Sequence, residues 1–485
     1  MDGRPSFLKS GERARLFPVL AETSKEGRTL SVVLSSIAYV EEFGAKLFAS
    51  IGQKKGARTK VEMFTEIVFA KSDTKVRPDG LVVLTTGKRQ WTALVEAKIG
   101  NTTLDLPQIE SYLQLARDNG IDAVITLSNQ FTAQPDHHPL SPQKASLRKV
   151  GLFHWSWMFV MTQATLLLAA KAVEDVDQAR ILSELVRFLS HPSTGVKGFE
   201  RMPSVWKNVV TAARGDAPIK KNSPEVKEII TAWHEEVRDL CLIMSRLLQT
   251  QVEIKLPRSH RNDQKKRVGD DSELLSVKQR LNCELDIPDT ANTISIEANL
   301  RTRSILLSMR LAAPGDKKSS LARVNWIVRQ LSKTNSNEIH IRAIWPGKSQ
   351  ATQASLEELR ENAEILISGR DKKMILTSFD VLFIRELSGK FSGPKTFVDG
   401  LEEAVPDFYE HVGQHLRAWT PSAPRLRGKT EPSDVSPQAI QKEIEDKRPA
   451  DFAEERAQSA SGGEEVRFSQ DLGEKRDGIE ASDKG

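Results

Sequence analysis

Residues 77–98 read RPDGLVVLTTGKRQWTALVEAK: an acid, a short apolar run, a polar turn, and a second apolar run ending in Glu-Ala-Lys. Short apolar runs on both sides of a turn are typical of a β-hairpin. A glycine at the first position of a turn at Gly87-Lys88 supplies the positive φ that a two-residue hairpin loop needs. The stretch therefore predicts two antiparallel strands, at 80–85 and 91–98.

The register of this hairpin predicts which side chains meet. If Thr86 faces Arg89, the same register puts Asp79 opposite Glu96. Directly opposed Cβ atoms lie about 4.5–5.5 Å apart, and two carboxylates at that distance repel unless a cation lies between them. Their oxygen atoms suit Mg²⁺ or Mn²⁺. Lys98 follows Glu96 by two residues and shares its face of the strand. The pattern predicts a metal site for phosphodiester hydrolysis.

Pro78-Asp79 followed by Glu96-Ala97-Lys98 resembles the motif of the PD-(D/E)xK nuclease superfamily, which includes many restriction and repair endonucleases. An apolar strand expected at 61–69 precedes the acidic turn, as the first core strand does in that family. Gln108 opens the next expected helix, as an additional glutamine does in many members. The resemblance covers residues 29–160 and implies a restriction-endonuclease-like α/β core with a mixed sheet.

The resemblance also implies roles for these residues. Asp79, Glu96 and the carbonyl of Ala97 would hold Mg²⁺, with Mn²⁺ as a possible substitute. Lys98 would orient or activate the attacking water, and Gln108 would hold the substrate or the lysine.

A glutamate from the first helix usually completes such a site. Glu41 and Glu42 are both candidates, and the sequence does not separate them. The alternative interpretation of the whole motif is a surface hairpin whose acid and lysine form an exposed ion pair, worth under about 1 kcal/mol.

Changes in residue pattern divide the chain into five parts. We expect an N-terminal extension at 1–28, the nuclease-like domain at 29–172, a helical connector at 173–250, a second α/β domain at 251–419 and a disordered tail at 420–485. Within these parts, helices are expected at 30–51, 107–119, 224–249, 319–332, 353–364 and 405–418, and strands at 121–127, 150–153, 251–256, 293–298, 304–311, 339–345, 373–377 and 380–385.

A basic segment without apolar residues lies near the start of the second domain. Its cations are Arg258, Arg261, Lys265, Lys266 and Arg267. One interpretation is a loop that binds phosphates of a nucleic acid. A solvated surface loop is the alternative, and the sequence favours neither.

Composition limits the classes of function. The 485-residue chain has a net charge of +5, a mild basic bias that suits nucleic-acid binding. Its two cysteines, Cys241 and Cys283, lack metal-ligand spacing and require no oxidising compartment. The N-terminus does not resemble a signal peptide, and no glycine loop ending Gly-Lys-Ser/Thr indicates an ATPase. Residues 151–170 carry no Asp, Glu, Lys or Arg, and we interpret them as a buried helix.

These observations and the resemblance predict a cytoplasmic, Mg²⁺-dependent endonuclease that acts on double-stranded DNA without membrane contact. A role in restriction or anti-phage defence, as a homodimer or with a partner protein of the defence system, is implied by the resemblance alone. Two alternatives remain open. One is a catalytically inactive nucleic-acid-binding or assembly protein with a nuclease fold, and the other is a membrane-associated protein anchored by 151–170.

Overall fold

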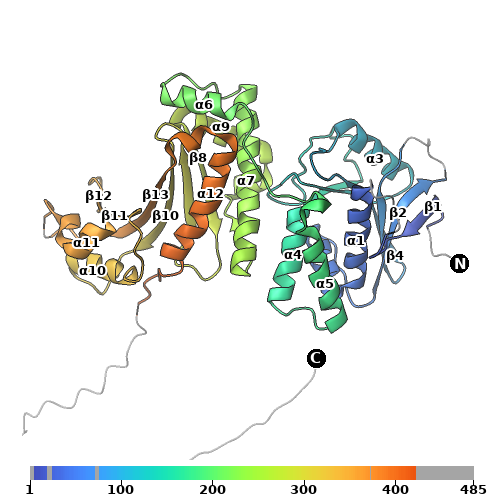
Figure 1. Ribbon diagram of the computed structural model, residues 1–485, viewed down its shortest axis with the longest axis horizontal. Coiled ribbons are helices and arrows are strands. Elements are labelled where there is room, and N and C mark those ends of the chain that lie inside the picture. The colour runs from blue at the N-terminus through green and yellow to red at the C-terminus, as the bar shows by residue number, and fades with distance from the viewer. Residues whose placement is uncertain (1–4, 19–23, 71–75, 372, 422–485) are drawn as a thin grey trace, which may run out of the picture. The chain divides into compact units, whose positions relative to one another are not determined.

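The computed structural model describes residues 5–18, 24–70, 76–371 and 373–421, which form a mixed α/β structure with two sheets (Figure 1). These residues belong to one compact unit that ends at Pro421. The tail expected at 420–485 lies outside the described residues, except for its first two positions.

The first sheet has the strand order β1-β2-β3-β4-β5-β6. Its strands are β1 (Leu8–Arg13), β2 (Thr59–Phe69), β3 (Gly80–Thr86), β4 (Arg89–Ala97), β5 (Ala123–Ser128) and β6 (Gly151–Ser156). Neighbours from β1 to β4 are antiparallel, whereas β4, β5 and β6 are parallel. The parallel step from β4 to β5 requires a crossover, and helix α3 (Leu106–Asp118) supplies it. The mixed sheet confirms the expected α/β class, and β2 to β6 lie near the expected strand positions.

Both faces of this sheet are buried, because successive side chains of β3 enter different cores. Val82 and Leu84 pack with α1 (Lys25–Tyr39), α2 (Glu41–Ser50), α4 (Trp157–Ala169) and α5 (Val176–Leu189). Leu81 and Val83 pack on the other face with α3. Burial on both faces explains why the strands are continuous apolar runs in the sequence.

The prediction of a single helix at 30–51 is wrong in two respects. It begins earlier, at Lys25, and it is interrupted at Val40, whose φ of −97° and ψ of 108° are extended. Helices α1 and α2 approach closely at the break: a Cβ on Gly44 would lie only 2.5 Å from the carbonyl oxygen of Ile37. A residue larger than glycine would force them apart.

The N-terminal part is not a separate extension. Strand β1 pairs antiparallel with β2, and α1 begins at Lys25, before the expected domain boundary at residue 29. The described residues of 1–28 thus contribute one edge of the sheet and the first turn of its first helix.

The uncharged segment 151–170 divides into β6 and the 13-residue helix α4. Strand β6 confirms the strand expected at 150–153, whereas the interpretation of the whole segment as one buried helix is wrong for 151–156. Among the described residues, no helix has both the length and the apolar character needed to cross a membrane.

The connector is helical as expected. It contains α5, the short η1 (Pro192–Thr194), α6 (Trp206–Arg214) and α7 (Pro224–Leu248). Helix α7 confirms the expected start, because the Ser223 hydroxyl accepts a hydrogen bond from the amide of Val226 and Pro224 occupies the first turn. Its apolar stripe, including Trp233 and Val237, packs into the same core as the second sheet.

The second sheet is antiparallel, in the order β12-β11-β13-β10-β9-β8-β7. Its strands are β7 (Glu253–Ile254), β8 (Arg280–Asp286), β9 (Ile294–Asn299), β10 (Ser304–Ala312), β11 (Ile339–Ile344), β12 (Thr352–Ser355) and β13 (Ser378–Glu386). Its helices are α8 (Arg258–Asn262), α9 (Gln264–Lys278), α10 (Ser320–Gln330), α11 (Leu356–Glu361) and α12 (Pro394–Phe408), with the short 3-10 helices η2 (Ala363–Ile367) and η3 (Ser388–Ser392) and the π-helix η4 (Tyr409–Gly413).

Four of the expected strands in this region are confirmed as β9, β10, β11 and β13. The strand expected at 373–377 is wrong, and the helix expected at 353–364 begins as β12. The helix expected at 405–418 is confirmed in part, because α12 starts earlier, at Pro394, and helical structure continues through η4 only to Gly413. Strand β8 and helix α9 were not anticipated.

Candidate functional site

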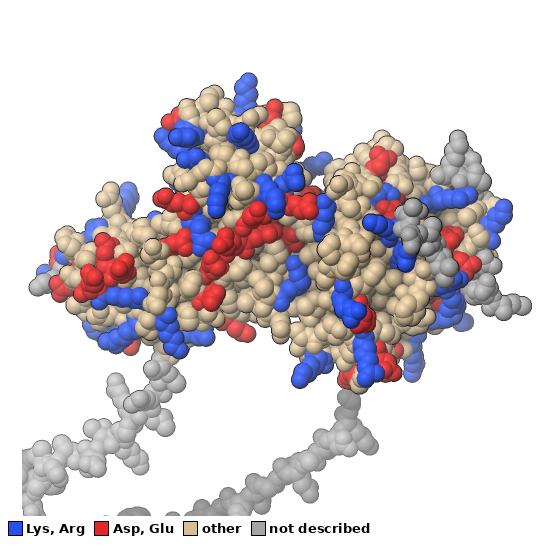
Figure 2. Space-filling model, viewed as in Figure 1, with Lys and Arg blue, Asp and Glu red and all other residues tan. Residues whose placement is uncertain are grey.

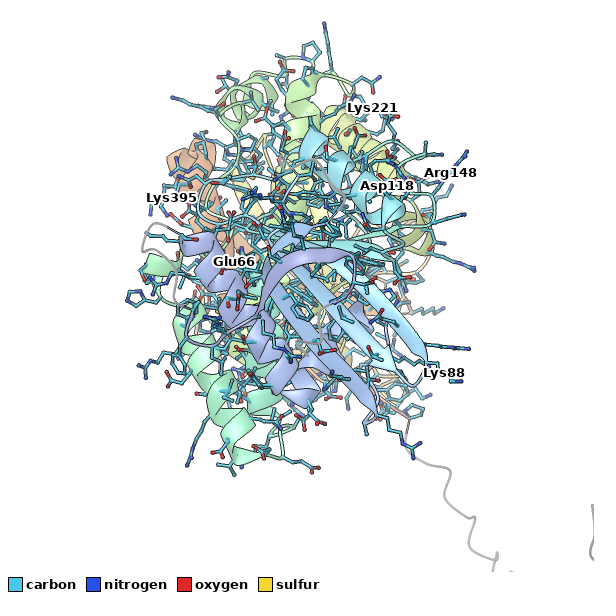
Figure 3. The ribbon with its side chains drawn as sticks, turned by 90° about the vertical axis from the view of Figure 1, so that its right-hand side faces the viewer. Glu66, Lys88, Asp118, Arg148, Lys221 and Lys395 are labelled. Atoms are coloured by element: carbon cyan, nitrogen blue, oxygen red, sulfur yellow. The ribbon has the colours of Figure 1, made fainter. Side chains whose placement is uncertain are left out.

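The hairpin formed by β3 and β4 has the predicted register. Thr86 pairs with Arg89 and Gly80 pairs with Val95, and Gly87 in the turn has a φ of +60°. Lys88 is exposed at the turn end of the hairpin (Figure 3). The predicted acids therefore lie at the opposite end, where the two strands enter the body of the sheet.

Asp79 and Glu96 are held at that end by the strands themselves. The Oδ2 atom of Asp79 accepts a hydrogen bond of 2.8 Å from the backbone amide of Ala97, which fixes the acid against the neighbouring strand. Glu96 is only 1 % exposed. Next to Asp79, Gly80 lets β3 lie close to β2, because a Cβ there would lie 3.0 Å from the carbonyl oxygen of Phe64.

Lys98 is held close to two carboxylates. Its ammonium donates a hydrogen bond to Oε1 of Glu96 and lies 3.6 Å from Oε1 of Glu26. Its backbone is fixed as well, because its amide donates to Leu127 and its carbonyl accepts a 2.8 Å hydrogen bond from the indole of Trp157. The lysine is thus positioned by β5 and α4 in addition to its own strand.

Glu26 is the helix glutamate that the structure brings to Lys98, and the sequence analysis missed it. Glu41 and Glu42, the residues proposed for this role, lie instead at the start of α2, where their charges act on Lys55. The error follows from placing the helix start at Leu30. Extending the buried stripe back by four residues from Leu30 would have brought Glu26 onto the same face.

Gln108 lies in the first turn of α3, where Asp105 caps the helix by accepting from its amide. Its side-chain amide donates a 2.9 Å hydrogen bond to the hydroxyl of Tyr112, one turn further along. That hydroxyl donates in turn to the carbonyl of Arg77, at 3.1 Å. Gln108 therefore acts through Tyr112 on the backbone that leads into Asp79, a link that the sequence analysis did not anticipate.

Burial and the charge of Glu96 shift the pKa of Asp79, raising it to about 7. Burial by itself lowers the pKa of Lys98, but its hydrogen bond to Glu96 and the nearby carboxylates outweigh burial and leave that pKa above the ordinary value. Lys98 therefore stays an ammonium at neutral pH. The Oε2 atom of Glu96 is buried without a hydrogen-bond partner among the described residues.

These features fit a divalent cation held by few protein ligands. A buried carboxylate oxygen with no partner is costly unless a cation or water occupies its lone pairs. Asp79 and Glu96, with the Ala97 carbonyl, could supply three oxygen ligands, and Mg²⁺ usually keeps several waters besides. In the part of the chain that the structure describes, no group of three His, Cys, Asp or Glu side chains is arranged to hold a metal. A cation here would therefore be held by two carboxylates and not by a cage of three or more such side chains.

The basic segment differs from the expected loop, because it forms α8 and the start of α9. The cap of α9 is Asp263, whose side chain accepts from the amide of Lys266. Arg258, Arg261, Lys265 and Lys266 are exposed. Arg267 is not available to a phosphate backbone, because it is buried near Asp271.

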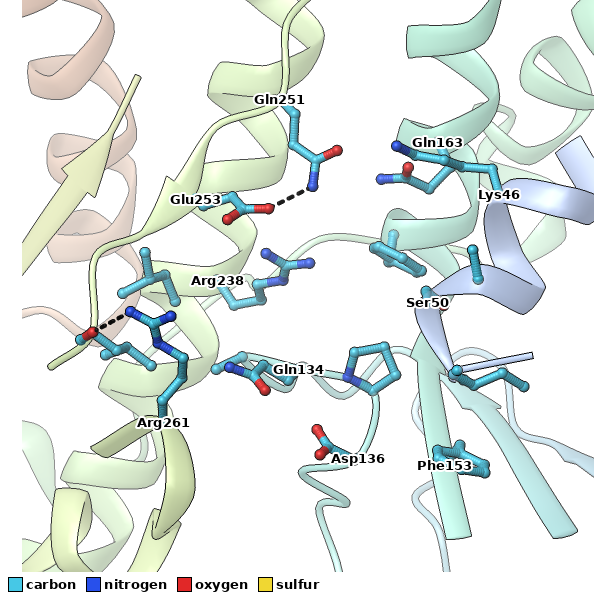
Figure 4. Close-up of a pocket in the computed structure, with 18 of the residues that line it drawn as sticks. Lys46, Ser50, Gln134, Asp136, Phe153, Gln163, Arg238, Gln251, Glu253 and Arg261 are labelled. Atoms are coloured by element: carbon cyan, nitrogen blue, oxygen red, sulfur yellow. Dashed lines mark hydrogen bonds between the residues drawn. The ribbon is translucent and has the colours of Figure 1, made fainter. Parts of the chain in front are cut away.

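A cavity of about 880 Å³ lies elsewhere in the molecule (Figure 4). Lys46, Gln163, Arg238 and Glu253 are among the residues around it, and Gln251 donates a 2.7 Å hydrogen bond to Glu253 at its edge. None of the predicted metal ligands lines it. This cavity and the candidate metal site are therefore separate.

Comparison with models of known protein families, with curated proteins and with solved structures finds no match to this chain.

Proposed function

We propose that this chain is a metal-dependent nuclease with a restriction-endonuclease-like core, which hydrolyses phosphodiester bonds in DNA. The observation that carries the proposal is the pair of desolvated acids, Asp79 and Glu96, with the Lys98 ammonium on the same face. Each of the three residue types has a use in phosphodiester hydrolysis, and together they match the motif found in the sequence.

The side chains have separate roles in this proposal. Asp79, Glu96 and the Ala97 carbonyl would hold Mg²⁺ or Mn²⁺, which would stabilise charge on the transferring phosphate and lower the pKa of a bound water. Lys98 would donate hydrogen bonds to that water or to a phosphate oxygen, because its raised pKa keeps it charged and unable to act as a base at neutral pH. Glu26 would keep this ammonium in place, and Gln108 would steady the Asp79 backbone through Tyr112.

The second sheet and its helices would bind the target. Exposed cations on α8 and α9 favour a phosphate backbone as partner. A restriction or anti-phage setting is proposed on the motif resemblance alone.

The test is incubation of the purified full chain with supercoiled and linear plasmid, single-stranded DNA and RNA, each with Mg²⁺, with Mn²⁺ and with chelator. We expect metal-dependent cleavage of duplex DNA, lost in Lys98→Met and retained in Asp118→Asn, a control on the exposed end of α3. Binding of Mn²⁺ without cleavage of any substrate would favour the inactive binding protein instead.

A further inference from the structure

A second polar pocket, of about 200 Å³, lies in the region of the second sheet and is distant in sequence from the candidate metal site. All of its lining residues come from 254–295, on β7, α8, α9, β8 and β9 and the segments between them. Three basic side chains, Lys255, His260 and Arg267, are among them. The pocket is therefore built by one continuous stretch of chain.

Arg267 is the unusual member of this pocket. Its side chain is only 7 % exposed, and its nearest counter-charge among the described residues is Asp271, whose Oδ2 lies 3.8 Å from Nε. Within the described residues its guanidinium has no hydrogen-bond partner, and none of its nitrogen atoms is completely shielded from solvent. A guanidinium carries five N–H donors, and a buried charge without hydrogen bonds is strongly disfavoured.

The neighbouring carboxylates are already engaged. Asp271 accepts a 2.6 Å hydrogen bond from Nε2 of His234, which directs that oxygen to the histidine. Glu284 lies 3.9 Å from the Lys255 ammonium at the pocket. His260 is held in turn by a 2.8 Å hydrogen bond to Asp270. The terminal nitrogens of Arg267 are therefore free to donate to an acceptor that enters the pocket.

We propose that this pocket binds a phosphate-type oxyanion, with the guanidinium of Arg267 as its forked anchor. Planar guanidinium groups bind phosphate and carboxylate oxygens in pairs, and the hydrogen bonds are stronger because they are charged. A volume of about 200 Å³ admits a phosphate group and a few waters, whereas sites for whole drug-sized ligands are about 300–1,000 Å³. The carboxylates of Asp271 and Glu284 also line the pocket, and they would repel an anion with more negative charge than a single phosphate group. The inference is independent of the nuclease proposal, because it uses none of its residues.

The experiment is a calorimetric titration of the full chain with inorganic phosphate, and separately with a nucleoside 5′-monophosphate, at constant ionic strength. We expect saturable binding by the wild type, weakened about tenfold or more in Arg267→Met. Lys278→Met is the matched control, because it removes one positive charge from an exposed position of the same helix, α9. It should bind as the wild type does. If the nucleoside monophosphate binds more tightly than inorganic phosphate, the ligand of the pocket is a phosphorylated compound. If the two bind equally, the ligand is the free ion.

Arg267→Lys tests the proposal if Arg267→Met does not fold. Lysine keeps the positive charge but cannot form the paired hydrogen bonds of a guanidinium. It should bind several-fold more weakly than the wild type. Binding by Arg267→Lys that equals that of the wild type would contradict the forked anchor. Absence of saturable binding of either probe by the wild type would overturn the proposal and show that water alone satisfies Arg267.

Discussion

Lys98 and Glu26 carry the part of the candidate site that a motif alone does not define. The 3.6 Å approach of the Glu26 carboxylate adds a second negative group to the lysine that already bonds Glu96. Lys98 is 13 % exposed, so its position depends on these partners more than on solvent. If the site is catalytic, disturbing Glu26 should disturb the lysine first and the metal ligands less.

We therefore predict that Glu26→Gln slows metal-dependent cleavage by about tenfold or more, because a neutral amide attracts the ammonium less strongly than a carboxylate. Glu41→Gln, on the exposed start of α2, should have no effect. Initial rates with saturating metal distinguish them. Equal rates in both variants would show that Glu26 takes no part and that the lysine is positioned by Glu96 alone.

A buried network of two histidines adjoins the site on the same sheet. In the register of β4, β5 and β6, Glu96 pairs with Thr126, which pairs with His154. Oγ1 of Thr126 lies 2.9 Å from Nε2 of His138 and 2.8 Å from Nδ1 of His154.

The other ring nitrogens set the direction of these bonds. Nδ1 of His138 accepts from the Leu140 amide, so Nε2 donates to Thr126. Nε2 of His154 lies 2.9 Å from the carbonyl of Gln130 and must donate, so its Nδ1 accepts from the threonine. Both rings are neutral in this arrangement.

This network predicts a loss of stability in acid. Burial lowers the pKa of His138 to about 4 and that of His154 to about 3, below the ordinary histidine value of 6.5. Between those values and 6.5 the unfolded chain binds protons that the folded chain does not, so stability falls as pH falls. Each histidine contributes up to about 1.4 kcal/mol per pH unit.

Urea unfolding of the wild type and of His154→Gln at pH 7, 6 and 5 measures this effect. The difference between the two proteins isolates the histidine, because buried acids such as Asp79 act in the opposite direction in both. We expect the variant to be less stable at pH 7 and to lose less stability on acidification. Parallel pH curves would rule out a neutral, buried His154.

At the level of elements, the hairpin of β3 and β4 depends on its turn. Gly87 has a φ of +60°, a region that L side chains avoid, and a Cβ there would contact nothing within 4 Å. Gly87→Val should therefore cost only backbone strain, about 1–2 kcal/mol of unfolding free energy. Gly56→Ala is the control, since that glycine has open space and no positive φ. Denaturant midpoints of the two variants test the difference, and an equal cost would mean that the turn conformation does not matter.

Helices α8 and α9 carry the cations proposed to bind nucleic acid. Changing Arg258, Arg261, Lys265 and Lys266 to Ser should weaken DNA binding. It should also reduce the slope of log affinity against log salt by about 0.9 for each duplex phosphate that the variant no longer neutralises. Binding is measured with Ca²⁺ in place of Mg²⁺, to suppress cleavage. An unchanged slope would assign these residues to a solvated surface.

The helices and strands that could be predicted from the sequence are those with a clear local pattern of apolar side chains. The hairpin and its neighbouring strands were correct because apolar runs bounded by turns indicate buried strands. Strand β1 was not predicted, because its sequence, LKSGER, has only one buried residue and so no apolar pattern. The strand is defined by its backbone pairing with β2. Helix α9 was taken for a loop because its segment begins with four polar residues, although Asp263 is a recognisable N-cap.

The same reasoning explains the candidate site. Asp79, Glu96 and Lys98 were predicted because a two-residue turn fixes which positions face each other. Glu26 was missed because Ser24 makes no side-chain cap and the apolar stripe begins only at Leu30. Tyr112 could have been found from its spacing of four residues from Gln108.

At the scale of the whole molecule, charge distribution bears on where a nucleic acid would bind. Over the helices of the second sheet, acidic and basic side chains lie on different elements. Acidic side chains gather over α12, where Asp399 and Glu403 are exposed and Glu402 is partly so (Figure 2). A duplex would be repelled there. The exposed cations of α8 and α9 belong to other elements, so a nucleic acid would favour these helices over α12.

The central claim is that Asp79 and Glu96 hold a divalent ion on which phosphodiester cleavage depends. Its most direct test is the initial rate of plasmid cleavage as a function of Mn²⁺ concentration, for the wild type and for Asp79→Asn. We predict a rate that saturates with metal in the wild type, vanishes with chelator, and falls by at least about a hundredfold in the variant. Cleavage that persists in chelator, or an Asp79→Asn rate equal to that of the wild type, would contradict the claim.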